Sequence, residues 1–136
     1  MHSLAILMDL PEDAMYLALG DYLAERVDAV GLDRLRPIER TLWLVREFHW
    51  VAHDGGLLGY RIHPSSQHAD DAVLALSTVG AELAASVLRQ AMAVEGDISE
   101  LAAHPGLSDE VEDLPLLVCR YALAHREAIL AGGSAE

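Results

Sequence analysis

The sequence predicts a single all-α domain of about six helices. Apolar side chains recur every three to four residues along most of the chain, and no segment alternates apolar and polar residues as a β-strand would. Glycine and proline fall at the ends of these periodic segments. A chain of 136 residues that is 52% hydrophobic can bury one core. We expect the domain to span residues 1–131 and residues 132–136 to form a flexible C-terminal tail.

The first two helices are marked by proline at their starts and glycine at their ends. Pro11 and the two acidic residues after it predict a helix that stops at Gly31, because proline suits the first turn and acids favour the positive end of the helix dipole. Pro37 opens the second helix, which we expect over residues 38–53. The Asp-Gly-Gly sequence at 54–56 is expected to end it.

The middle of the chain is predicted to hold a loop followed by a pair of helices. Residues 55–67 contain three glycines and a proline, so we interpret them as a structured loop or a short helical turn. Helices are expected over residues 68–79 and 81–94, with Gly80 breaking or kinking the chain between them.

The C-terminal part is predicted to hold a short helix, an acidic loop and a long helix. Asp97 and Glu100 form a capping-box pattern for a short helix that reaches Ala103. An acidic loop is expected over residues 105–113. Asp113 and then Pro115 are expected to open the last helix, which runs to Leu130.

The charge of the chain excludes two classes of binding protein. Asp and Glu number 22 against 9 Lys and Arg, for a formal net charge of -13. Proteins that bind nucleic acids or anionic membranes rely on a positive field, so neither direct nucleic-acid binding nor membrane binding is predicted. No apolar stretch approaches the roughly 18 residues of a membrane span, and the N-terminus lacks the pattern of a targeting segment. With Cys119 as the lone cysteine, we expect a cytoplasmic protein with a reduced, inert thiol.

Four histidines raise the possibility of a metal site. His49, His53, His63 and His68 lie within twenty residues, and the first two share a helix face at the i, i+4 spacing of helical zinc ligands. The glutamate that serves as base in the metalloprotease motif is absent between them, and no third ligand follows at a fixed spacing. We therefore predict no bound metal, no cofactor and no enzyme activity, and packed or capping histidines as the ordinary explanation.

The carboxylates form two groups that suit a basic partner. Asp21, Glu25 and Asp28 share one helix face about 5–6 Å apart, opposite the expected core. A second group lies in the acidic loop and consists of Asp109, Glu110, Glu112 and Asp113. Such rows either keep the protein soluble as a solvated face or imitate the charge density of a phosphate backbone. We predict that these seven carboxylates bind a basic protein.

Two tryptophans form a separate stripe from the apolar face of their helix. Trp43 and Trp50 are seven residues apart and fall among charged residues. They cover a loop within the monomer, or they anchor a second subunit or another partner, where tryptophan is favoured. We predict a homodimer and take both indoles as candidate anchors of the dimer or of the partner contact.

Residues 51–92 resemble the small helical family typified by an acidic DNA-mimic protein. That family has a helix ending in Asn-Gly-Gly-aromatic, a short aromatic segment closing on asparagine, and a helix pair with Leu-x-x-Ile-Gly-Ala. The matching segments here are Asp54-Gly55-Gly56-Leu57, residues 60–63 from Tyr60, and residues 76–81 ending in Gly80-Ala81. The sequence departs from the pattern at Asp54, Leu57, Gly59 and His63.

The resemblance implies an all-helical fold, a homodimer, and an acidic surface that occupies the DNA-binding groove of a regulator or nucleoid protein. The function we predict is therefore non-enzymatic contact with a basic DNA-binding protein. Two alternatives stay open: an immunity-type inhibitor that blocks a basic toxin or nuclease through the same carboxylates, and a metal-dependent helical enzyme built on the four histidines.

Overall fold

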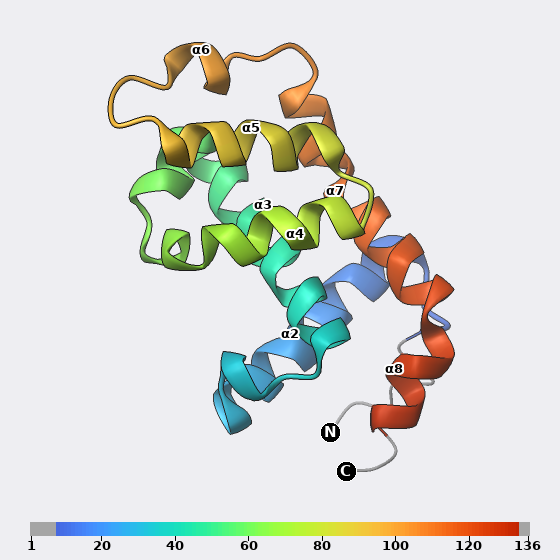
Figure 1. Cartoon of the computed structure of the whole chain (residues 1–136). Coiled ribbons are helices and arrows are strands. Elements are labelled where there is room, and N and C mark those ends of the chain that lie inside the picture. Colours follow the sequence, from blue (N-terminus) through green and yellow to red (C-terminus); the bar gives the residue numbers. More distant parts are fainter. Residues whose placement is uncertain (1–7, 134–136) are drawn as a thin grey trace.

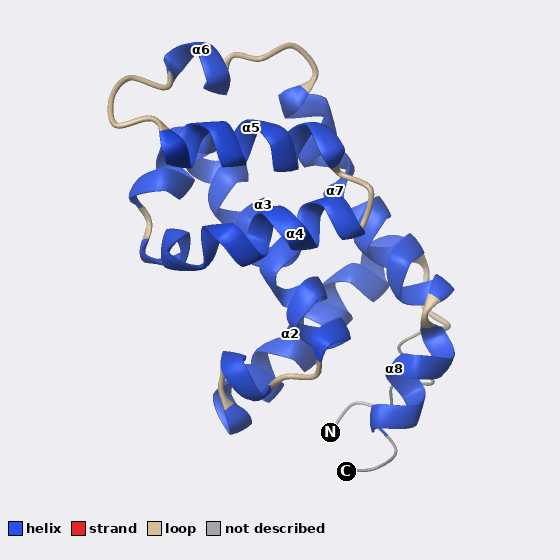
Figure 2. Ribbon diagram, in the orientation of Figure 1, coloured by secondary structure: helices blue, strands red, loops and turns tan. Residues whose placement is uncertain are grey.

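The computed structural model describes residues 8–133, with side chains through residue 130. Over this part of the chain the structure is all helical, with seven α-helices, two short 3₁₀ segments and no strand (Figure 2). The predicted fold class is confirmed. None of these helices is both long and apolar enough to cross a bilayer.

Helix α2 (Glu12–Val30) has the bounds that the sequence predicts. Glu12 and Asp13 lie in its first turn, where they favour the helix dipole, and Gly31 follows its last residue. Buried Leu19 and Leu23 face the core. A 3₁₀ turn, η1 (Leu32–Arg34), then leads toward the next helix.

Helix α3 (Pro37–Ile62) runs well past its predicted end. The Asp-Gly-Gly sequence does break the helical conformation, because Gly56 takes a positive φ of 66° that glycine adopts at little cost. A second helical segment continues past this kink to Ile62. Beyond the kink, Leu57 is 4% exposed and Tyr60 is 1% exposed. Burial of these two side chains holds the turns beyond the kink against the core. The expected loop at 55–67 is thus mostly helical and ends in η2 (Pro64–His68).

Helices α4 (Ala69–Thr78) and α5 (Glu82–Ala93) form the predicted pair and lie side by side (Figure 1). Gly80 breaks the chain between them with a φ of 97°. Small residues at and after the start of α5 are fully buried, at Ala81, Ala84 and Ala91.

The C-terminal helices differ from the prediction in two places. The short helix α6 (Ser99–Ala102) is present, but Asp97 accepts the backbone N–H of Ser99 from outside it and forms no capping box with Glu100. Helix α7 (Leu107–Ala124) begins inside the expected acidic loop and contains Pro115 in its interior. The predicted loop was wrong because buried apolar residues at its positions, Leu107 and Val111, extend the helix back toward Gly106.

The expected last helix is divided in two. The chain turns at His125, and α8 (Arg126–Gly133) follows. Arg36 donates to the backbone carbonyls of Ala128 and Ile129, at 2.9 and 3.1 Å, and so ties α8 to the start of α3. Helix α8 includes the first two residues of the expected tail, and residues 134–136 lie outside the described part of the chain.

The core forms around α3, which contacts α2, α4, α5, α6 and α7 (Figure 1). Phe48 and Tyr60 pack edge-to-face at its centre, with ring centroids 4.9 Å apart. One buried carboxylate, Glu39, is held between α2 and α3 by Tyr22 and nearby arginines. Residues of α3 line two surface cavities, one shared with α2 and α7 and one shared with α6 and α7.

Candidate functional site

A groove of about 400 Å³ lies where α2, α3 and α7 meet, and we name it the Trp50 groove. Leu17 on α2 and Trp50 on α3 are 62% and 53% exposed, so large apolar surfaces face solvent here. Aromatic rings and carboxylates line the same space. Its full lining is Asp13, Tyr16, Leu17, His49, Trp50, His53, Asp54 and Pro115.

A tyrosine–histidine pair belongs to the lining of the groove. The Tyr16 hydroxyl and His49 Nδ1 are 2.8 Å apart, and their rings meet edge-to-face at 5.5 Å between centroids. Burial, with smaller contributions from His53 and Arg46, lowers the pKa of His49 below its ordinary value. Burial also raises the pKa of Tyr16. At neutral pH the pair is therefore uncharged, and it brings no positive charge into the groove.

Arg46 links the two predicted tryptophan anchors into one unit. Its guanidinium lies 5.4 Å from the Trp43 ring centroid and 5.2 Å from that of Trp50. Trp43 is half-buried and packs against the core, whereas Trp50 stays half-exposed. The two indoles therefore differ in role: Trp43 is mostly structural, and Trp50 presents aromatic surface to solvent.

Gly20 on α2 leaves room for this arginine. A Cβ at position 20 would lie 2.1 Å from Arg46 Nε, much closer than any real contact. Gly20 and Arg46 are 26 positions apart in the chain, so no local pattern in the sequence pointed to their contact.

We expect Gly20→Ala to have opposite effects with and without Arg46. Alanine is favoured over glycine inside a helix by about 0.5–1 kcal/mol, so in an Arg46→Ala background the change should stabilise the fold. With Arg46 present, the new methyl displaces the guanidinium from both indoles, and about 0.5–1 kcal/mol per lost cation–π contact cancels or reverses that gain. Urea unfolding of the four proteins in a double-mutant cycle measures the difference. Equal effects of Gly20→Ala in both backgrounds would contradict the contact.

The first predicted set of carboxylates lies on the outer face of α2. Asp21, Glu25 and Asp28 are all exposed, as is Asp13 at the groove. At about 100° per residue these four positions fall within an arc of about 120°, along about 22 Å of helix. We name this surface the acidic ridge: Asp13, Asp21, Glu25 and Asp28. It begins at the Trp50 groove and runs toward the end of α2.

The second predicted set lies on α7 rather than in a loop. Asp109, Glu112 and Asp113 are exposed there. Glu110 has a structural contact, since its Oε1 accepts the backbone N–H of Ala84 at 2.6 Å, at the start of α5. The first turns of α7 and the last turns of α2 lie at opposite ends of the molecule (Figure 1). The structure therefore does not bring the two acidic sets together, and the groove lies between them.

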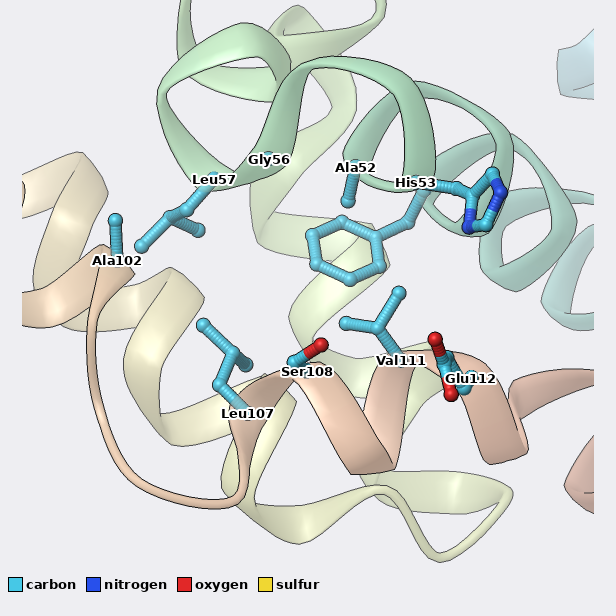
Figure 3. A pocket seen from close by; sticks show the side chains of 10 residues that line it. Ala52, His53, Gly56, Leu57, Ala102, Leu107, Ser108, Val111 and Glu112 are labelled. Atoms are coloured by element: carbon cyan, nitrogen blue, oxygen red, sulfur yellow. The ribbon is translucent and has the colours of Figure 1, made fainter.

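A second cavity, of about 300 Å³, lies between α3 and the α6–α7 segment. Leu57 and Ala52 of α3 face Leu107 and Val111 of α7 across it, and His53 and Glu112 lie at one end (Figure 3). Its lining also includes Phe48 and Ser108. We centre the candidate site on the Trp50 groove, where exposed aromatic surface and carboxylates meet.

Two of the four clustered histidines are neighbours: the His49 and His53 rings have centroids 5.8 Å apart, and both line the Trp50 groove. His49 pairs with Tyr16, and His63 Nδ1 accepts the backbone N–H of Ser65 at 3.0 Å. Among the residues that the structure describes, no three His, Cys, Asp or Glu side chains come together in a way that could hold a metal ion. Burial raises the pKa of Cys119 to about 11, so this side chain is a neutral thiol at physiological pH.

Comparison with known families gives one match. The sequence model of the DMP19-like protein family matches residues 33–125. The chain belongs to the DMP19-like protein family. Searches of curated proteins and of solved structures found no match. The family is of the DNA-mimic type, as the resemblance over residues 51–92 implied.

The motif residues that carried the resemblance lie within the matched segment and shape the fold. Gly56 makes the kink of α3, Gly80 separates α4 from α5, and Tyr60 and Ala81 are buried. Asp54 and Gly55 lie exposed in the turn of α3 before the kink, and Asp54 also lines the Trp50 groove. All four ridge carboxylates, at positions 13, 21, 25 and 28, lie before the matched segment, so their role rests on this chain alone.

Proposed function

We propose that the protein acts as a DNA mimic, by occupying the DNA-binding surface of a basic regulator or nucleoid protein. The observation that carries the proposal is the acidic ridge. Its carboxylates are exposed on the face of α2 that points away from the core. Membership of the DMP19-like family and the net charge of -13 support the same reading.

The physics of the ridge suits this role. Neighbouring carboxylates on one helix face repel each other by a few tenths of a kcal/mol per pair, and a basic surface relieves that repulsion on binding. The same charges draw a positive groove toward the protein and raise the rate of encounter. A partner arginine that pairs with a ridge carboxylate is no longer available to a DNA phosphate, so the two ligands compete.

The proposal places the protein among non-enzymatic binding proteins of the cytoplasm. Its contact is with a protein, through Asp109, Glu112 and Asp113 on α7 as well as the ridge, and it does not involve nucleic acid or a membrane. Glu110 contributes charge to the same surface while its Oε1 holds the start of α5.

A homodimer remains part of the proposal, with its contact placed away from the Trp50 groove. A two-fold contact centred on the groove would bring Asp13 and Asp54 of one copy against the same residues of the other. Such like-charge juxtaposition is unfavourable between two chains that are each strongly acidic. Of the three roles that the sequence allows for Trp50, we therefore favour that of partner anchor.

Competition with DNA tests the proposed function. A pull-down from native lysate at low salt identifies the partner, and the purified partner is then titrated with this protein in the presence and absence of its DNA. We expect DNA to displace the protein, and the affinity to fall steeply between 50 and 300 mM salt because the charges are screened within about 8–10 Å. A ternary complex with DNA, or binding that salt does not change, would reject mimicry. A toxin as the partner would favour the immunity-type alternative.

A further inference from the structure

The Trp50 groove combines three features that together select one kind of ligand. It has exposed apolar walls in Leu17 and Trp50, a concave volume of about 400 Å³, and carboxylates from two helices, Asp13 of α2 and Asp54 of α3. We propose that the groove holds an arginine side chain of the basic protein partner, with its guanidinium against the Trp50 ring and paired with Asp13 and Asp54. This inference rests on the proposed function, because it names the contact that anchors the partner.

The charges around the groove fit a cation. Within the described part of the chain, the Asp54 side chain has no ion pair or hydrogen bond, so its charge is not already neutralised. His49 is uncharged at neutral pH because burial lowers its pKa. Arg46 does not belong to the lining, and its guanidinium already lies over the two indoles. An incoming cation therefore meets the carboxylates of Asp13 and Asp54 in the groove, and it shares the Trp50 ring with the Arg46 guanidinium, 5.2 Å from the ring centroid.

The aromatic wall favours arginine over lysine. A guanidinium is planar and weakly hydrated, so it stacks on an aromatic face and pairs with carboxylates at the same time. An ammonium is more strongly hydrated and loses more on leaving water. The chain already contains the same kind of contact, in the placement of Arg46 over Trp43 and Trp50 at 5.4 and 5.2 Å.

The position of the groove suits a central anchor. Asp13, Leu17 and Asp21 follow each other at intervals of four residues, so the groove and the ridge share one face of α2. An arginine bound beside Trp50 would place the neighbouring basic residues of the partner along the ridge. A desolvated aromatic contact surrounded by charges is the usual arrangement of an interface hot spot.

Two peptides of equal charge separate the groove from the general acidity of the protein. Fluorescently labelled octa-arginine and octa-lysine are titrated with the full-length protein at low salt, and binding is followed by fluorescence polarisation. We expect octa-arginine to bind about tenfold more tightly, because only its guanidinium gains from the Trp50 ring. Trp50→Ala should lower the affinity for octa-arginine to that for octa-lysine and leave the affinity for octa-lysine unchanged.

Matched variants guard against misfolding and against a general charge effect. Ile62→Ala removes an apolar side chain that is 77% exposed on the same helix but away from the groove, and it should keep the preference for arginine. Asp54→Asn is nearly isosteric and should weaken the binding of octa-arginine. In a Trp43→Phe variant, Trp50 is the one tryptophan that remains in the sequence. Its fluorescence emission should respond to octa-arginine but not to octa-lysine.

The outcomes distinguish this inference from the proposed function. If both peptides bind equally, or if Trp50→Ala weakens both alike, the groove is not an arginine site, while an acidic surface still binds basic ligands. If neither peptide binds at low salt, the proposed acidic contact fails and the inference fails with it. If sedimentation shows a dimer that Trp50→Ala dissociates, a second copy fills the groove and the arginine assignment is overturned.

Discussion

Replacing Glu39 with glutamine is expected to lower the free energy of unfolding by about 3 kcal/mol. Glu39 is 1% exposed and joins α2 to the start of α3. Its Oε2 accepts from the Tyr22 hydroxyl at 2.9 Å and pairs with Arg26 and Arg36 at 3.4 and 3.3 Å. Its Oε1 accepts the Arg36 backbone N–H at 3.2 Å. An uncharged amide at this buried position no longer balances the positive charges of the two arginines.

The expected loss is large against the total stability of a domain, which is about 5–15 kcal/mol. It stays near the lower end of the range for a broken buried ion pair, because Arg26 and Arg36 are 18% and 26% exposed and regain part of their hydration. Glu82→Gln is the control, since this exposed carboxylate in the first turn of α5 should contribute less than about 1 kcal/mol. Urea unfolding of the three proteins measures both changes.

The pH dependence of stability gives a second test of Glu39. Burial alone would raise the pKa of this carboxyl, but the hydrogen bonds from Arg36 and Tyr22 outweigh it and hold the pKa below the ordinary value of 4.5. The unfolded chain therefore takes up the proton at a higher pH than the folded chain. The stabilisation is present above about pH 4.5 and is lost as the pH falls below it. Stability curves of wild type and Glu39→Gln that stay parallel from pH 6 to pH 3 would contradict this account.

The helices that the sequence predicts well are those whose local signals agree with their packing. Helix α2 starts after a proline, ends before Gly31 and buries one face, and α4 and α5 are separated by Gly80 as expected. The errors arise where a local signal opposes burial. Leu57 and Tyr60 carry α3 beyond a glycine pair, and Leu107 starts α7 eight residues before Pro115.

The candidate site also has one part that the sequence predicts and one part that it does not. The exposure of Asp21, Glu25 and Asp28 follows from their spacing on one helix, so the local sequence is enough to predict it. The Trp50 groove depends on residues from three helices that meet only in the fold. From the sequence alone, Trp50 can be placed off the main apolar face of its helix, but its proximity to Asp13 and Pro115 cannot be predicted.

The acidic ridge should account for most of the affinity for a basic DNA-binding partner. We expect the triple reversal Asp21→Lys, Glu25→Lys and Asp28→Lys to weaken the complex about 100-fold at low salt, because three attractive contacts become repulsive. The fold should survive, since all three side chains are exposed and one row of like charges replaces another. Isothermal titration measures the affinity, and circular dichroism checks the helical content.

A second triple reversal separates the ridge from the net charge. Exposed carboxylates that lie outside both acidic sets are reversed in the control, at Asp70, Glu95 and Glu127. The two variants have equal net charge, so a loss caused by overall acidity would appear in both. We expect the control to weaken binding much less, and the gap between the variants to close as salt shortens the range of the charges to a few ångströms. If the control weakens the complex as much as the ridge variant, the partner responds to the acidity of the whole protein, and the outer face of α2 is a solvated surface rather than an imitation of the phosphate backbone.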